Sequence, residues 1–154
     1  MMTPGDLTLL RHAIDLAREA KQAGDQPFGS LLVSGEGQVL AEERNSVVTE
    51  RDVTAHPELK LARWASRALD VEERRRATVY TSGEHCPMCA VAHANAGIGR
   101  LVFAFSSRQL AQLTGDPGWR LPVRDLFDRR GLDTVVEGPA TELTAEVTAL
   151  HTPD

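Results

Sequence analysis

Two short motifs constrain this chain more than any other feature of its sequence. His56 and Glu58 are separated by one residue, and the only two cysteines, Cys86 and Cys89, are separated by two. Pro87 and the alanine-rich run after the second cysteine are typical of the first turn of a helix, where residues three apart share a face. Two thiolates and the His56 imidazole would give Zn²⁺ three protein ligands and leave a fourth tetrahedral position for water, as in catalytic rather than structural sites.

The charge of this ligand set bears on the role of Glu58. Two thiolates and a neutral imidazole already balance a divalent cation, so Glu58 need not ligate and is left free to move protons. By itself, a C-x-x-C pair also fits a redox dithiol or half of a structural zinc site. Its pairing with H-x-E at a helix start favours the catalytic site, and the alternative for Glu58 is an ordinary surface carboxylate.

Composition indicates an ordinary globular chain. Its 154 residues, 42% apolar and 25% charged, predict a single domain over 1–154, and a chain of this length buries roughly 70% of its unfolded surface. Two cysteines argue against a disulfide framework, and neither an apolar run of about 18 residues nor a basic, apolar leader is seen, so we expect a cytoplasmic protein. The net charge of −5 disfavours a chain that tracks many nucleic-acid phosphates.

The hydrophobic pattern predicts alternating helices and strands along most of the chain. The charged stretch 72–76 reads as a link, residues 45–53 as a loop, and residues 106–123 show no regular pattern. The expected elements are, in order, a helix over 7–22, a hairpin with strands at 28–33 and 39–41, a helix that begins near 54, a strand over 78–81, a helix at the cysteines, a strand over 101–105, a short helix over 124–130, a strand over 134–136 and a last helix near 143–150.

The last two strands indicate the sheet topology. The apolar run 101–105 is typical of a strand covered on both faces. The segment between it and the strand at 134–136 is far too long for a hairpin and contains a helix, so we expect a parallel crossover. The sequence therefore predicts an α/β fold, a three-layer α/β/α sandwich around a mixed sheet of about five strands.

In this order the motifs resemble those of the zinc-dependent cytidine-deaminase-like superfamily, specifically its branch of guanine, cytosine and tRNA adenosine deaminases. The resemblance covers the chain from about residue 10 to residue 105 and implies the fold of that superfamily. It rests on the segments Pro27–Gly29, Asn45, Asp52–Glu58, Thr81–Cys89 and Ile98–Phe103.

The resemblance implies a role for each motif residue. His56, Cys86 and Cys89 would bind Zn²⁺ as the cofactor. Glu58 would be the catalytic proton shuttle, taking a proton from water and returning it to a ring nitrogen. Asn45 would hydrogen-bond the substrate base, although it could be only a turn residue.

Four further residues are candidates for the substrate pocket, and most have a structural alternative. Phe28 either lines the pocket or packs beneath it. His85 stands where the family usually has proline, and like His93 it fits either a pocket role or an ordinary hydrogen bond. Trp119 is either a lid that stacks on a base or part of the core. Asp116 lies in the region where guanine deaminases place an additional acid.

The resemblance implies a zinc-dependent hydrolase that deaminates a small aminated heterocycle and releases ammonia. A free nucleobase is favoured, guanine first and cytosine second, with a nucleoside, a modified purine or a triazine left open. One alternative is a tRNA adenosine deaminase, favoured by the Ile98–Phe103 segment and opposed by the net charge. Another is a non-catalytic, zinc-stabilised partner subunit, against which the intact Glu58 argues.

The remaining expectations concern partners and two further residues. Family precedent implies a homodimer that acts on a small molecule and water, and neither nucleic acid nor a membrane is expected as a partner. Glu84 is read as structural or as a support for the metal site. His151 is read as structural.

Overall fold

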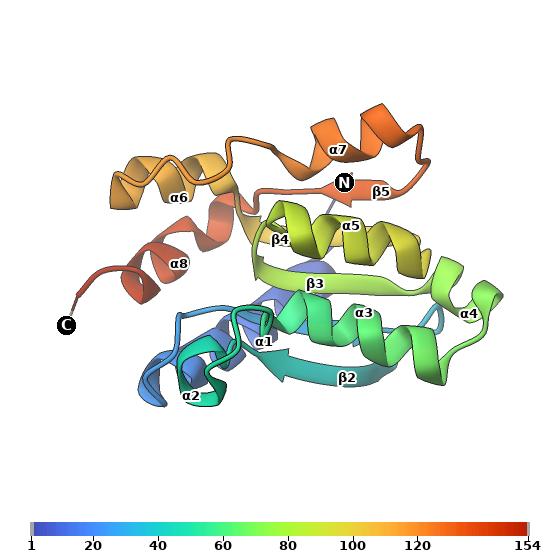
Figure 1. Cartoon of the computed structure of the whole chain (residues 1–154), viewed down its shortest axis with the longest axis horizontal. Coiled ribbons are helices and arrows are strands. Elements are labelled where there is room, and N and C mark those ends of the chain that lie inside the picture. The colour runs from blue at the N-terminus through green and yellow to red at the C-terminus, as the bar shows by residue number, and fades with distance from the viewer. Residues whose placement is uncertain (1, 154) are drawn as a thin grey trace.

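A computed structural model describes residues 2–153 and shows a five-stranded sheet with helices on both faces (Figure 1). The strands lie in the order β2-β1-β3-β4-β5. The elements are α1 (Pro4–Gln22), β1 (Gly29–Val33), β2 (Val39–Arg44), α2 (Val47–Glu50), α3 (Pro57–Ala68), α4 (Val71–Arg76), β3 (Thr78–Gly83), α5 (Pro87–Ala96), β4 (Arg100–Phe105), α6 (Ser107–Thr114), α7 (Val123–Arg130), β5 (Val135–Glu137), the 3₁₀ turn η1 (Thr141–Leu143) and α8 (Thr144–Leu150).

The sheet is mixed, as the sequence predicted. β1 pairs antiparallel with β2 and with β3, and the β1–β2 hairpin closes through the turn from Ser34 to Gln38, where Gly37 takes a φ of +87°. β3 pairs parallel with β4, and β4 with β5. These two parallel pairs need crossovers, which α5 and the α6–α7 region supply.

Two apolar layers hold the helices to the sheet. On one face, Leu10 of α1 and Leu150 of α8 pack against the sheet; on the other, Leu61 of α3 and Phe127 of α7 do so together with α5. Figure 1 shows α3 and α5 in front of the sheet and α1 behind it. Strand β4 contributes side chains to both layers, as the apolar run 101–105 predicted.

Three readings of the sequence were wrong in detail. The charged link is helix α4, which begins at an Asp70–Glu73 capping box. The segment without a pattern contains α6, which begins at a Ser106–Gln109 capping box, and the loop 45–53 contains the single turn α2. In the capping boxes of α4 and α6, the side chains pair with backbone N–H groups that a helix start leaves unpaired. These two helix starts could therefore have been recognised from the local sequence. Within residues 2–153, no helix has the length and apolarity needed to cross a bilayer.

Candidate metal centre and active-site pocket

The three predicted metal ligands come together at the starts of two helices that pack against each other. His56 is the N-cap of α3, and Cys86 is the N-cap of α5. Each helix has a proline, Pro57 or Pro87, at its first position, where the missing N–H costs nothing. Cys89 lies one turn into α5 and is fully buried. The two local helix starts therefore aim their donor atoms at one point.

The donor distances fit a tetrahedral metal. His56 Nδ1 lies 3.6 Å from Cys86 Sγ and 3.5 Å from Cys89 Sγ. Zinc–sulfur and zinc–nitrogen bonds of about 2.3 and 2.05 Å at tetrahedral angles require a sulfur–nitrogen separation of about 3.6 Å. All three donor atoms lie within 4.8 Å of one another. The cluster thus has the chemistry and the spacing of a zinc site.

The three donor groups also shift one another's pKa values. A hydrogen bond from the Cys89 thiol, opposed by burial and aided by His56, lowers the pKa of Cys86 to about 4. The same contact and burial raise the pKa of Cys89, and the hydrogen bond with Cys86 raises the pKa of His56. Because metal ligands must be deprotonated, a metal ion that binds here releases protons.

Glu58 lies beside this cluster in the first turn of α3. Its side chain is only 6% exposed, and burial raises the pKa of its carboxyl group. Its Oε1 lies 3.1 Å from Thr81 Oγ1 and 3.3 Å from Ser30 Oγ, and the two hydroxyls lie 2.8 Å apart. Thr81 Oγ1 also lies 2.9 Å from the carbonyl oxygen of Gly83, so these buried hydroxyls on β1 and β3 form one hydrogen-bond network that orients the carboxyl group.

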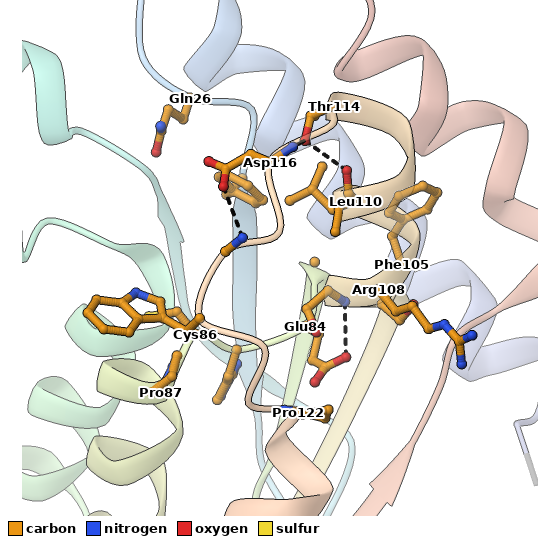
Figure 2. A pocket seen from close by; sticks show the side chains of 18 of the residues that line it. Gln26, Glu84, Cys86, Pro87, Phe105, Arg108, Leu110, Thr114, Asp116 and Pro122 are labelled. Atoms are coloured by element: carbon orange, nitrogen blue, oxygen red, sulfur yellow. Dashed lines mark hydrogen bonds between the residues drawn. The ribbon is translucent and has the colours of Figure 1, made fainter.

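A pocket of about 660 Å³ opens above the cluster. Every predicted site residue lines it except Cys89, which is buried below. Its sides come from three parts of the chain: the segment before β1, the starts of α3 and α5, and the segment from Ser106 to Pro122 with the end of α8. Figure 2 shows Cys86 and Pro87 on one side of this pocket and Leu110 with Asp116 on another.

Asn45 presents hydrogen-bond donors to the pocket. The residue is 1% exposed, and its Oδ1 accepts a hydrogen bond from the backbone N–H of Val47 at 3.0 Å. This contact assigns the oxygen and the nitrogen of the side-chain amide, because the N–H group of Val47 must face an oxygen. Within the described chain, 2–153, the Nδ2 group has no protein partner, so it can donate to a ligand in the pocket.

The other predicted pocket residues differ in how they are held. The Phe28 ring packs against the His151 ring with centroids 5.2 Å apart. Asp116 lies at the exposed rim, where its Oδ1 accepts a hydrogen bond from the backbone N–H of Gly118 at 2.9 Å. Trp119 is 81% exposed, so it lies at the pocket rim and is not a core residue.

His85 and His93 form a buried hydrogen-bonded pair. His93 Nε2 lies 3.1 Å from the carbonyl oxygen of Ile98 and must donate to it. Its Nδ1 then accepts from His85 Nε2 at 3.1 Å. Burial lowers the pKa of His85 well below its usual range and that of His93 to about 4, so both rings are neutral. His85 Nδ1 is left as a buried acceptor without a protein partner in residues 2–153, and His93 does not line the pocket.

His151 is among the pocket residues that the sequence did not reveal. His151, read as structural, follows α8 and lines the pocket against Phe28 and Phe105. It is distant in sequence from every motif, and only the packing of α8 on the sheet brings it there. No local pattern could have identified it.

Comparison with known proteins agrees with this geometry. The sheet and the donor set place the chain among the deaminases of the cytidine-deaminase-like superfamily, as the sequence motifs indicated. The chain belongs to the MafB19-like deaminase family, whose sequence model matches residues 5–116.

Three similar proteins show the range of this superfamily. The chain is 32% identical to a probable cytosine deaminase of Schizosaccharomyces pombe over 89% of this chain and 85% of that protein. It is 41% identical to the guanine deaminase of Bacillus subtilis over 53% of each, so it matches about half the length of that relative. A structure from a study of A-to-I editing by tRNA:A34 deaminases matches with a TM-score of 0.72 and 26% identity, over 94% of this chain and 99% of that one.

Proposed function

We propose that this protein is a zinc-dependent hydrolytic deaminase of a small aminated heterocycle, with guanine as the first candidate and cytosine as the second. The observation that carries the proposal is the position of Glu58, a buried carboxyl group oriented by two hydroxyls beside the His56, Cys86 and Cys89 donor atoms. A partner subunit without catalysis has no need of this arrangement.

His56, Cys86, Cys89 and Glu58, at the bottom of the pocket, each have a task in this reaction. His56 Nδ1 and the two thiolates would hold zinc, which when bound would lower the pKa of water and so provide a nucleophile near neutral pH. Glu58 takes a proton on its carboxyl group and returns it to a nitrogen of the substrate ring. The oxygen of the water bonds to the ring carbon that carries the amino group. The bond between this carbon and the amino group then breaks, Glu58 carries the proton of the new hydroxyl group to the amine, and ammonia leaves while a carbonyl remains.

Asn45 and two rings that line the pocket support a planar, polar substrate. The Asn45 Nδ2 group can donate to a ring nitrogen or carbonyl oxygen, and a buried donor of this kind strongly disfavours analogues that lack the acceptor. The rings of Phe28 and His151 supply flat apolar surface. A cavity of about 660 Å³ has room for a free base.

The relatives support both bases. The match to the Bacillus subtilis guanine deaminase has the higher identity, and the match to the Schizosaccharomyces pombe probable cytosine deaminase covers more of both chains. We place guanine first because the Pro27–Gly29 segment beside the pocket resembles the guanine deaminase branch.

A tRNA adenosine deaminase is the second candidate. The structural match to a study of tRNA deaminases supports it, and so does the pocket rim, where Trp119 lies beside Arg120 and Arg108 also lines the pocket. An exposed aromatic ring with guanidinium groups suits unpaired nucleotides. The net charge of −5 argues against it.

The test is ammonia release by zinc-loaded protein with guanine, cytosine, adenine, their nucleosides, aminotriazines and an anticodon stem-loop as substrates. Turnover of one free base that disappears in Glu58→Ala supports the proposal. If inosine forms on the stem-loop and no free base or nucleoside is turned over, the protein is a tRNA adenosine deaminase. If zinc binds stoichiometrically and no substrate releases ammonia, the proposed activity is wrong.

A further inference from the structure

Much of the substrate pocket is built by a segment that the core holds at few points. About half of the residues that line the pocket lie in 106–122, which we call the pocket wall. None of its residues is buried, whereas Phe105 and Val123, which flank it, are buried. Core packing therefore fixes the two ends of the pocket wall, and within the wall the partly buried Leu110 also packs against the core.

Glu84 reaches both ends of the pocket wall. Its Oε1 accepts a hydrogen bond from the backbone N–H of Ser107 at 3.0 Å, and its Oε2 accepts one from the N–H of Val123 at 2.8 Å. Its own N–H donates to the carbonyl oxygen of Phe105 at 2.8 Å. Figure 2 shows Glu84 directed towards the backbone of this segment.

No other residue shares this task. Within residues 2–153, Glu84 is the only residue outside the pocket wall and the adjoining helix α7 that forms a hydrogen bond with the wall. The remaining hydrogen bonds of the wall are internal, such as the Ser106–Gln109 capping box. Apart from the packing of Leu110 on the core, the position of the wall relative to the metal cluster therefore depends on the hydrogen bonds of one carboxylate.

The chemistry of this contact is favourable. Ser107 and Val123 are the first residues of α6 and α7, and the first N–H groups of a helix have no partner within it. A carboxylate there gains two charge-assisted hydrogen bonds and the partial positive charge of two helix starts. Because Glu84 precedes Cys86 by two residues, the pocket wall is tied to a metal-binding segment.

We propose that Glu84 is a positioning residue that sets the shape of the substrate pocket by tying both ends of the pocket wall to the segment that carries Cys86. The proposal deepens the proposed function, since it assigns substrate selectivity to this contact. The carboxylate of Glu84 forms its hydrogen bonds with the two ends of the pocket wall and not with the metal ligands. It acts through Leu110 and Trp119, whose distance from the metal cluster it fixes.

The first test is amide hydrogen exchange of Glu84→Gln. The amide of glutamine can accept from only one of the two N–H groups and turns its NH₂ group towards the other. Losing a hydrogen bond to a charged group costs at least about 1.4 kcal/mol, which is a tenfold factor. We expect exchange at Ser107 or Val123, and through the pocket wall, to become about tenfold faster, with α3 and α5 unchanged.

A matched control is available in α4. Glu73→Gln removes another carboxylate that accepts a backbone N–H in a capping box, far from the pocket. It should leave exchange in the pocket wall at the wild-type rate. Bound zinc, measured per chain, should stay the same in both variants, which separates a moved wall from a damaged metal cluster.

The second test is kinetic and uses the substrate that the ammonia-release assay identifies. Glu84→Gln should raise KM severalfold and narrow the discrimination between guanine and cytosine, while kcat for the better base changes less than KM. Glu73→Gln should change neither.

The proposal is overturned if exchange in the pocket wall of Glu84→Gln equals that of the wild type, or if exchange rises while KM and discrimination stay the same. If no substrate is turned over by the wild type, the proposed function fails and the claim of selectivity fails with it. Hydrogen exchange still decides whether Glu84 holds the pocket wall.

Discussion

The floor and the wall of the pocket are built on opposite principles. The floor is made of helix starts and strand residues that are mostly buried, with Glu58 held by hydroxyls of β1 and β3. The wall, 106–122, has no buried residue and is tied down at its ends by Glu84. The comparison teaches that the floor can hold the reacting groups accurately. Sequence changes in the wall can alter which substrate is accepted without moving the groups of the floor.

The largest expected effect is on the floor. Glu58→Gln keeps the shape of the side chain and removes its ability to accept a proton. We expect kcat to fall by about 10²–10⁴-fold, since positioned acid–base groups contribute on that scale. Bound zinc and the far-UV circular dichroism spectrum should match those of the wild type. A loss of zinc in this variant would mean that Glu58 helps to hold the metal.

A buried histidine outside the pocket lining should make the stability of the protein depend on pH. His93 is buried and neutral, with its pKa lowered from 6.5 to about 4. The unfolded chain therefore binds more protons than the folded one between these values. The free energy of unfolding should be highest above pH 6.5 and fall by roughly 3 kcal/mol towards pH 4 on account of this group.

Denaturant titrations of the wild type and His93→Gln from pH 7 to pH 4 check this expectation. Glutamine can still donate to the Ile98 carbonyl and accept from His85, but it does not titrate. The stability difference between the two proteins should shift in favour of the variant as the pH falls. A difference that is constant with pH would show that His93 is not buried as a neutral ring.

A smaller effect is expected for the support of Glu58. Ser30→Ala removes one of the two hydroxyls near Oε1 and leaves the Thr81 hydroxyl in place. We expect kcat to fall by about tenfold with little change in KM, because losing one hydrogen bond costs about 1 kcal/mol and loosens the carboxyl group. A rise in KM with unchanged kcat would place Ser30 among the groups that bind substrate.

The smallest effect on stability should come from the wall. Trp119→Ala removes an 81% exposed ring, so the free energy of unfolding should change by less than about 0.5 kcal/mol. KM should rise severalfold if the ring covers the substrate. A large loss of stability would contradict the difference between floor and wall, since it would show that the wall is part of the core.

The same difference explains what the sequence could predict. The grouping of His56, Cys86 and Cys89 and the strand at 101–105 could be predicted because short motifs and an apolar run carry them. The wall could not be predicted, because α6 has no buried face whose period could reveal it, and only its capping box gave a local signal. Contacts between distant segments decide whether Trp119 belongs to the core. Such contacts also bring His151 to the pocket.

The most direct test of the central claim is removal and return of the metal. Chelator-treated protein should release no ammonia from the substrate of the wild type, and one equivalent of zinc per chain should restore the activity, whereas Cys86→Ser should bind zinc weakly and recover little. Ammonia release at the wild-type rate by metal-free protein would contradict the account, because the pocket floor would then work without the centre on which it is built.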